Sequence, residues 1–333
     1  MAEKENLACC EKLRTSIGGQ ALIEGIMMRG PKKDAIVIRT AEGLTVEVND
    51  RKLNPEGSFK NWPFFRGVFN FFDAQVTGVK ALMRSAELSP EEYEEEPSKL
   101  EKWLEKKLDN ETFQKVVIGL AVAMGLGLSI VLFFLLPMIV GGFFDRWIDS
   151  ILGINLVEGL IRMCVFMTYI ILVSRMGEMK RVFAYHGAEH KTIRCYEMGL
   201  ELTVENVRPQ TRLHPRCGTS FLLVVMVTSI LVFSVASSGL LELIPGLAAL
   251  RGGFLYRLIM IVFKLLLLPI VVGITYEINR WAGRNDNWLT RIIAAPGMWM
   301  QNFTTNEPDD SMIEVAIKAV QAVLLEKEGE DRW

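Results

Sequence analysis

The feature that most constrains this chain is a set of apolar stretches long enough to cross a lipid bilayer. Residues 116–140 and 219–238 carry no charged side chain, and residues 151–173 and 254–276 are almost as apolar. A helix of about 20 such residues spans the hydrocarbon core of a membrane. Half of all residues are hydrophobic, which agrees with this pattern. We therefore predict an α-helical polytopic membrane protein with about four transmembrane helices.

Four charged residues lie inside these stretches, and one of them, Arg257, is near the start of the fourth. Glu158 and Arg162 are four positions apart in the second stretch, and Lys264 lies within the fourth. Residues i and i+4 share one face of a helix, so Glu158 and Arg162 are expected to neutralise each other or to extend toward the membrane surface. Charged groups within spans also line transport paths, so a transport role stays open.

The distribution of lysine and arginine predicts the orientation. Five lysines lie between residues 99 and 115, eight basic residues lie between the second and third stretches, and three arginines lie between residues 280 and 291. The other two connections hold one arginine each, Arg146 and Arg251. Cytoplasmic loops are enriched in basic residues. We expect a multi-pass protein of the cytoplasmic membrane with both termini in the cytoplasm.

The remaining segments predict soluble structure. Residues 35–40 and 44–49 alternate with a period of two around a short turn, which predicts a β-hairpin. The aromatic-rich segment 62–83 reads as a helix, either at the membrane surface or packed on the hairpin. An acidic linker, Glu91–Glu96, follows. An amphipathic helix is expected after the capping sequence Glu307–Ser311.

These elements divide the chain into three segments. A small α+β cytoplasmic N-terminal domain is expected over residues 1–115, and a four-span membrane domain over 116–276. The membrane domain includes a cytoplasmic His/Cys loop at 174–218. A cytoplasmic helical tail is expected over 277–333.

The histidines give the strongest functional signal. The chain has three, His186, His190 and His214, and all lie in the loop at 174–218. His186 and His190 belong to the pattern H-x-x-E-H. On a helix both imidazoles face the same side, where they can bind one divalent metal ion such as Zn²⁺. Glu189 is then the candidate general base, as in inverted zinc peptidases.

Further candidate ligands follow in the same loop. His214 and Cys217 form H-x-x-C just before the third apolar stretch and offer a nitrogen and a thiolate for a tetrahedral site. Cys195 is another candidate thiolate, and Glu277 at the inner end of the fourth stretch is either an extra ligand or an interfacial anchor. The alternative is that the histidines are polar interface residues, that Glu189 forms an ion pair and that Cys217 is a small buried residue.

A glycine-rich segment, residues 18–31, precedes the predicted hairpin. It lacks the Gly-Lys-Ser/Thr of a Walker loop and does not fit G-x-G-x-x-G. We interpret it as a structural turn, with Glu24 and Arg29 as the residues that could point into a site. The net charge of −2 and the absence of a basic stripe argue against nucleic-acid binding. Five cysteines without regular spacing argue against a disulfide framework.

Four sequence blocks resemble the YqhQ-like bacterial membrane proteins. They are residues 18–31, 185–197, 214–221 and 296–310, read as GGQALIEGIMMRGP, YHGAEHKTIRCYE, HPRCGTSF and PGMWMQNFTTNEPDD. That family is a domain of unknown function and is often labelled a predicted metal-dependent enzyme. The resemblance covers roughly residues 16–325. It implies a bacterial inner-membrane protein with a metal site at His186, Glu189, His190, His214 and Cys217.

Two functions fit these observations. One is a metal-dependent membrane hydrolase with a cytoplasm-facing H-x-x-E-H site, acting on a peptide or lipid-linked substrate at the inner leaflet. The other is a non-enzymatic scaffold or transport-associated protein that uses the same residues as a structural metal site. The lipid bilayer is the expected partner in both cases.

Overall fold

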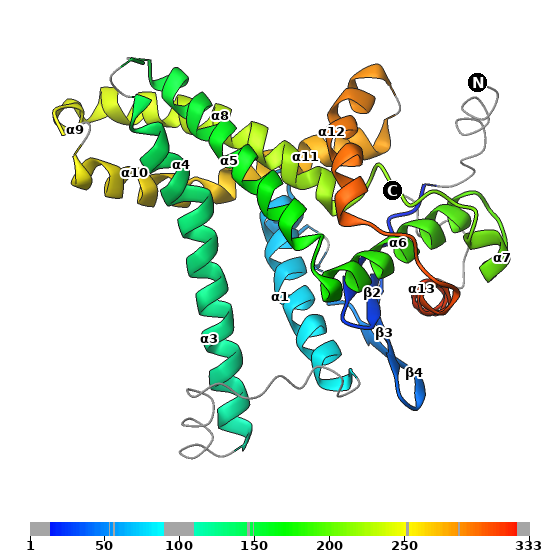
Figure 1. Cartoon of the computed structure of the whole chain (residues 1–333). Helices are drawn as coiled ribbons and strands as arrows, with labels where there is room; N and C mark the ends of the chain where they lie inside the picture. Colours follow the sequence, from blue (N-terminus) through cyan, green and yellow to red (C-terminus); the bar gives the residue numbers. More distant parts are fainter. Residues whose placement is uncertain are drawn as a thin grey trace. The chain divides into compact units, whose positions relative to one another are not determined.

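The fold combines a small antiparallel sheet with long helices (Figure 1). The computed structural model describes residues 14–324 except 53, 56, 90–109, 145, 146, 149, 251, 252 and 286, so the predicted linker Glu91–Glu96 lies outside the described residues. The strands are β1 (Gly18–Leu22), β2 (Gly25–Arg29), β3 (Lys33–Thr40) and β4 (Gly43–Asp50). The first helical elements are a 3-10 turn (Phe59–Asn61), α1 (Phe65–Leu88), α3 (Asn110–Ile130), a π-helical turn (Val131–Leu135), α4 (Leu136–Gly141) and α5 (Ile151–Val173). The later helices are α6 (Gly177–Glu197), α7 (Val204–Val207), α8 (Gly218–Leu243), α9 (Pro245–Ala248), α10 (Phe254–Leu266), α11 (Leu268–Arg284), α12 (Trp288–Thr304) and α13 (Asp310–Val323).

The four strands pair in the order β1-β2-β3-β4, and all pairs are antiparallel. The predicted hairpin at 35–40 and 44–49 is confirmed as β3 and β4. The interpretation of residues 18–31 as only a turn is wrong, because they form the hairpin β1–β2 with Glu24 at its tip in a left-handed conformation (φ 51°). Gly25 shows why glycine is needed here: a Cβ would lie 2.5 Å from the carbonyl oxygen of Val37 on β3.

Three helical segments are long and apolar enough to cross a membrane: Gly119–Gly141, Ile151–Val173 and Phe221–Leu243. They coincide with the first three predicted spans. The fourth predicted span is a pair of helices, α10 and α11, bent by 40° at their junction. Pro269 lies in the first turn of α11 and has no backbone N–H to continue the hydrogen bonding of α10. The described residues therefore contain three candidate spans, or four if the bent pair counts as one.

The chain divides into two compact units. One gathers residues up to Ser89, Ile170–Thr228 and Pro269 onward, and the other gathers Pro90–Tyr169 and Ser229–Leu268. Each unit thus gathers residues from more than one of the three segments predicted along the chain. In the first unit, segments far apart in the sequence share one core, in which apolar side chains of the sheet, α6 and α13 pack together.

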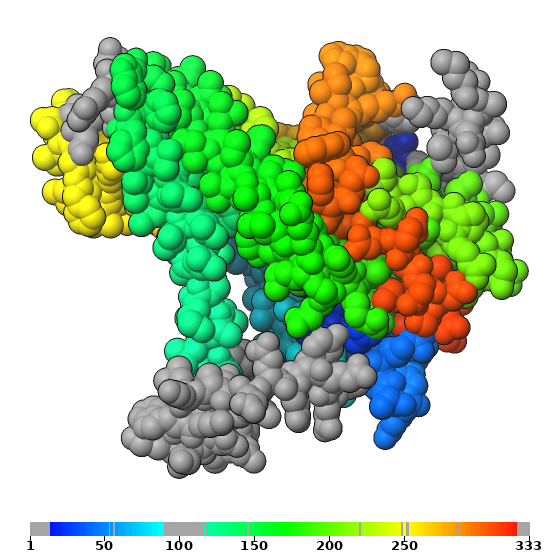
Figure 2. Space-filling view, viewed as in Figure 1, coloured from blue at the N-terminus to red at the C-terminus, as the bar shows by residue number. Residues whose placement is uncertain are grey.

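This core places the His-bearing helix α6 against the sheet. Ile26, Met28 and Val37 of the sheet are fully buried with Tyr185 of α6 and Val320 of α13. Figure 2 shows the red α13 against the yellow-green segment that follows α6 and against the blue strands. The predicted capped helix after residue 307 is confirmed as α13, whose N-cap Asp309 accepts a hydrogen bond from the backbone N–H of Met312.

Helix α1 packs on the sheet with one face only. Ala81 is buried against Leu22 and Met27, and the hydroxyl of Ser85 donates to the carbonyl oxygen of Ile23. The packing alternative for segment 62–83 is therefore confirmed. Large apolar side chains such as Phe72 on the remaining faces are exposed, so a membrane-surface contact is compatible with this packing.

The second unit buries charged side chains among its helices. Glu158 on α5 forms an ion pair with Lys264 on α10. Arg162 donates from Nε to the carbonyl oxygen of Phe133 at 2.7 Å and from a terminal nitrogen to the hydroxyl of Ser229 at 3.3 Å. The ion-pair partner of Glu158 in the described structure is thus Lys264, and neither expectation for Glu158 and Arg162, a direct pair or extension to the membrane surface, named it.

Candidate metal centre

The site starts from helix α6, which carries H-x-x-E-H. His186 and His190 lie one turn apart on the same face, with ring centroids 4.4 Å apart. Gly187 lies on a different face, where the helix approaches the segment before α13. A Cβ at this position would lie 2.1 Å from the carbonyl oxygen of Asn306. A glycine inside α6 costs helix stability but permits this close contact.

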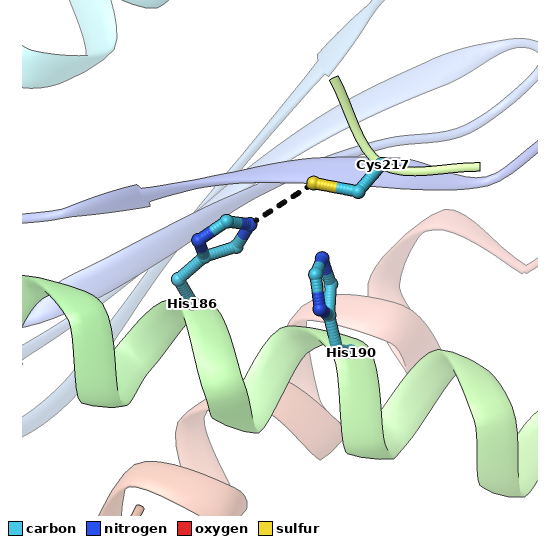
Figure 3. A group of neighbouring side chains, drawn as sticks. All are labelled: His186, His190 and Cys217. Carbon is cyan, nitrogen blue, oxygen red and sulfur yellow. Dashed lines mark hydrogen bonds between the residues drawn. The ribbon is translucent and has the colours of Figure 1, made fainter. Parts of the chain in front are cut away.

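Cys217 completes a group of three potential ligands (Figure 3). It precedes the first residue of α8, and its Sγ lies 3.3 Å from Nε2 of His186. The ligand atoms of His186, His190 and Cys217 all lie within 4.8 Å of one another. Cys217 thus meets His190 and His186, which lie 27 and 31 positions earlier in the sequence.

Backbone carbonyls orient both imidazoles. Nδ1 of His186 donates to the carbonyl oxygen of Thr304 at 2.8 Å, and Nδ1 of His190 donates to that of Arg212 at 2.6 Å. A histidine that donates from Nδ1 presents Nε2 as the ligand atom, and such donors are typical of metal-binding histidines. Nε2 of His190 is buried and has no hydrogen-bond partner within the described structure. Such an atom is costly unless something binds it.

The electrostatics favour a thiolate at Cys217. Burial raises the pKa of the Cys217 thiol, but the imidazoles of His190 and His186 outweigh burial and hold this pKa well below its ordinary value. The backbone N–H and the hydroxyl of Thr219 also donate to Sγ, at 3.4 and 3.3 Å. Burial lowers the pKa of His186, but Cys217, Glu189 and Thr304 together raise it to about 9. A thiolate is the form of cysteine that binds metals.

Glu189 lies at the edge of the three-residue group. One carboxylate oxygen accepts a hydrogen bond from the backbone N–H of Gly19 on β1 at 2.8 Å. The other lies 3.9 Å from Nε2 of His186. A Cβ on Gly19 would lie 3.0 Å from this carboxylate, so strand β1 fixes the Glu189 side chain beside the cluster. This contact links the glycine-rich segment to the candidate site.

His214 lies beside the cluster but faces another partner. Its ring centroid is 5.6 Å from that of His190, and its Nε2 is 3.2 Å from a carboxylate oxygen of Glu197. Burial lowers the pKa of His214, although Glu197 acts in the opposite direction. His214 as a metal ligand stays a prediction, and in the described structure its imidazole faces Glu197.

Two positioning residues were missed by the sequence reasoning. Glu197 is fully buried and contacts His214, Arg216 and the backbone N–H of Thr15. Gln301 on α12 accepts from the backbone N–H of His214 and donates to its carbonyl oxygen, each at 2.8 Å. The available signal was that Glu197 ends the resemblance block 185–197 and Gln301 falls in the block 296–310.

The other two candidate ligands lie outside the group. Cys195 is buried with Val207 and Ile313, and its Sγ donates to the carbonyl oxygen of Glu201. Glu277 forms an ion pair with Arg66 and accepts from the backbone N–H of Phe64. The interpretation of Glu277 as an anchor with a local ion pair is the one that these contacts fit.

Cys217 also lines a pocket of about 800 Å³. Pro215, Arg216 and Gly218 line the same wall. Volumes of about 300–1,000 Å³ are typical of sites for small molecules. The three-residue group therefore has one member in contact with a space large enough for a ligand.

Comparison with known proteins agrees with the family resemblance of the four sequence blocks. The family model described as "Protein of unknown function (DUF1385)" matches residues 62–326. The chain belongs to this family. It is 32% identical over 324 residues to "Uncharacterized protein YqhQ" of Bacillus subtilis (strain 168), covering 94% of this chain and 93% of that protein. The resemblance to YqhQ-like proteins is thereby confirmed. No solved structure matches the chain.

Proposed function

We propose that His186, His190 and Cys217 bind one divalent metal ion, most simply Zn²⁺, and that the protein is a metal-dependent hydrolase of the bacterial inner membrane. The observation that carries the proposal is the unpartnered, buried Nε2 of His190 beside the Cys217–His186 pair. Two imidazole nitrogens and a thiolate are a donor set that suits zinc. Bound metal would give Nε2 of His190 the partner that it lacks.

The distances fit such a centre. Zinc lies about 2.0 Å from nitrogen and 2.3 Å from sulfur, so neighbouring donor atoms in a tetrahedral site are about 3.3–3.6 Å apart. Nε2 of His186 and Sγ of Cys217 are already 3.3 Å apart. The widest separation in the group, within 4.8 Å, requires only small side-chain movements.

The arrangement favours catalysis over a closed structural site. Three protein ligands leave one coordination position open, which is typical of catalytic zinc. A bound divalent metal supplies Lewis-acid activation of a water or a substrate oxygen. Glu189 can accept a proton on the carboxylate oxygen that lies 3.9 Å from His186, while its other oxygen is held by Gly19. The pocket at Cys217 supplies access for the substrate.

A structural metal site is the alternative. It requires a fourth protein ligand, and His214 is the nearest imidazole. His214 would have to leave Glu197 to serve in this way. In that case the protein would be a scaffold or a transport-associated protein with both termini in the cytoplasm, as the basic segments suggest.

The variant Glu189→Gln tests the catalytic proposal. We would purify the full chain in detergent, reconstitute it in liposomes of bacterial total lipid, and add a fluorogenic casein peptide mixture. The experiment has two readouts. One is the zinc content, and the other is the hydrolysis of peptide or lipid, which is followed by mass spectrometry. We expect Glu189→Gln to keep its zinc and to lose hydrolysis by about 100-fold or more.

Glu178→Gln is the matched control, because Glu178 lies on the same helix and is exposed. We expect this variant to match the wild type in zinc content and rate. Hydrolysis at the wild-type rate by Glu189→Gln would contradict the role of Glu189. Zinc in a wild-type protein that hydrolyses neither substrate would favour the structural site.

A further inference from the structure

We infer that the pocket beside Cys217 binds the phosphate group of an anionic phospholipid, so that a phosphate-bearing lipid is the substrate class. The role of this lipid as a substrate rests on the proposed hydrolase function, whereas its binding in the pocket does not. It chooses between the peptide and the lipid-linked substrate left open by the sequence.

The first argument is the charge of the pocket wall. The described residues that line it include no aspartate, glutamate or lysine and six arginines: Arg14, Arg29, Arg51, Arg216, Arg280 and Arg291. Arginine presents a planar set of donors that matches phosphate oxygens in pairs. Guanidinium groups on a concave wall favour the binding of an anion there.

Three of these arginines, Arg29, Arg51 and Arg216, are held in place by carboxylates. Asp34 and Asp73 contact Arg29, Asp34 also lies 3.6 Å from Arg51, and Glu197 contacts Arg216. Positioned donors lose less entropy on binding than mobile ones.

Arg280 on α11 lies one turn after Glu277, whose carboxylate forms its ion pair with Arg66 instead. Arg280 forms no ion pair within the described structure, and its Nε is buried without a hydrogen-bond partner. A phosphate oxygen in the pocket would provide the missing acceptor. Arg280 is therefore the arginine whose contribution to anion binding can be tested with the least effect on internal ion pairs.

The second argument is that much of the remaining wall is apolar. Phe71 of α1, Phe221 of α8 and Ile293 and Met298 of α12 line the same space as the arginines. A free inorganic phosphate would leave this surface in contact with water. A lipid would place its phosphate at the arginines and the first part of its chains against the apolar side chains.

The third argument is the position of the pocket along α8. Arg216, Cys217 and Gly218 line it immediately before the candidate span, and Phe221, the first residue of that span, lines it too. The boundary between charged residues and a membrane-crossing helix lies at the depth of lipid head groups. The pocket is thus placed where phospholipid phosphates are present at high concentration.

Such a substrate is compatible with hydrolysis at the proposed centre of His186, His190 and Cys217. Hydrolysis of a phosphate ester consumes one water: the water oxygen bonds to phosphorus, the bond from phosphorus to the alcohol oxygen breaks, and the alcohol leaves with a proton. No oxidant, reductant or further reactant is needed. Glu189 is the residue that can hold the proton in transit.

The test is a binding titration with the full chain in dodecyl maltoside. Binding of fluorescently labelled phosphatidic acid is measured by fluorescence anisotropy. Unlabelled competitors are then added to displace the label. We expect phosphatidic acid to displace the label, phosphatidylcholine of the same chain length to be about tenfold weaker, and inorganic phosphate to be weaker still. Loss of one charge-assisted hydrogen bond in Arg280→Met should weaken binding about tenfold.

Arg284→Met is the matched control, because Arg284 lies one turn later on α11 and does not line the pocket. It should bind like the wild type, with both variants unfolding at the wild-type temperature. Equal competition by phosphatidylcholine or by inorganic phosphate would overturn the inference, as would unchanged binding by Arg280→Met. Retained lipid binding in a variant with both His186 and His190 replaced by alanine would support the pocket even if the protein proved to hold no metal. Zinc binding without lipid binding would leave the proposed hydrolase but remove this substrate class.

Discussion

At the residue scale, small side chains decide how closely the elements around the cluster approach. Gly19 permits strand β1 to reach Glu189, and Gly187 permits helix α6 to reach the carbonyl oxygen of Asn306. The Gly19 contact holds the Glu189 side chain beside the candidate ligands, and the Gly187 contact holds helix α6 close to the segment before α13. The orientation of the cluster therefore depends on residues that cannot bind metal themselves.

We predict that Gly187→Ala destabilises the protein although alanine favours helices by about 1 kcal/mol. The new Cβ would lie 2.1 Å from the carbonyl oxygen of Asn306, so backbone must move. Overpacking of this kind costs about 1–3 kcal/mol. Thermal unfolding in detergent measures the effect. Gly177→Ala, at the start of the same helix with open space around it, is the control and should be neutral or stabilising; equal unfolding temperatures for the two variants would show that the contact is not tight.

We predict that the contribution of Glu197 to the stability of the fold depends on pH. Burial raises the pKa of Glu197, but His214, Arg216 and the N–H of Thr15 outweigh burial and lower it. A carboxylate whose pKa is lower in the folded state stabilises the fold above its unfolded pKa of 4.5, and this stabilisation is lost as the pH falls through the folded pKa.

The variant Glu197→Gln should therefore lower the unfolding temperature most at pH 7, where it leaves Arg216 without its buried partner. Removal of one member of a buried pair costs about 3–5 kcal/mol. The difference from the wild type should shrink below pH 4.5. A difference that stays constant between pH 7 and pH 4 would contradict the ionised state of Glu197.

The residue scale also shows what sequence can and cannot predict. The shared face of His186 and His190 follows from helical periodicity, and the convergence of the loop with Cys217 was proposed from the clustering of the histidines. The contacts of Gln301 with His214 and of Gly19 with Glu189 join residues 87 and 170 positions apart. No local spacing encodes such contacts, because they depend on how α12 and β1 pack.

At the element scale, the buried pair Glu158–Lys264 joins α5 to α10 within one unit. Both side chains are almost fully buried. Sequence reasoning found the charged residues but not the pairing of Glu158 with Lys264, because periodicity gives only neighbours on the same helix. The bend between α10 and α11 was likewise not predicted, although Pro269 was its visible signal.

We predict that Lys264→Met destabilises the protein and that Lys264→Met combined with Glu158→Gln restores most of the loss. The single variant leaves a buried carboxylate unpaired, at a cost of about 3–5 kcal/mol, whereas the double variant removes both charges. Thermal unfolding in detergent provides the comparison. Equal destabilisation by the single and double variants would favour a transport path in which each charge has a separate role.

At the scale of the whole molecule, the basic segments predict the sidedness of the candidate spans. Residues 174–218 and the C-terminus should lie in the cytoplasm, and the connection near Trp147 should lie outside. Fusions of alkaline phosphatase, which folds only outside the cytoplasm, report this directly. We expect activity for a fusion after Trp147 and none for fusions after Gln210 or Trp333. An active fusion after Gln210 would place the histidines on the other side of the membrane and contradict a cytoplasm-facing centre.

The central claim for the molecule is that one metal ion is held by His186, His190 and Cys217. Its most direct test is elemental analysis of the full chain purified in detergent, beside Cys217→Ala and the variant with both histidines of α6 replaced by alanine. Cys195→Ala is the matched control, since Cys195 is buried outside the group. We predict about one zinc per chain in the wild type and in Cys195→Ala, and almost none in the other two variants. A wild type without bound metal, or equal metal in all four proteins, would contradict the account.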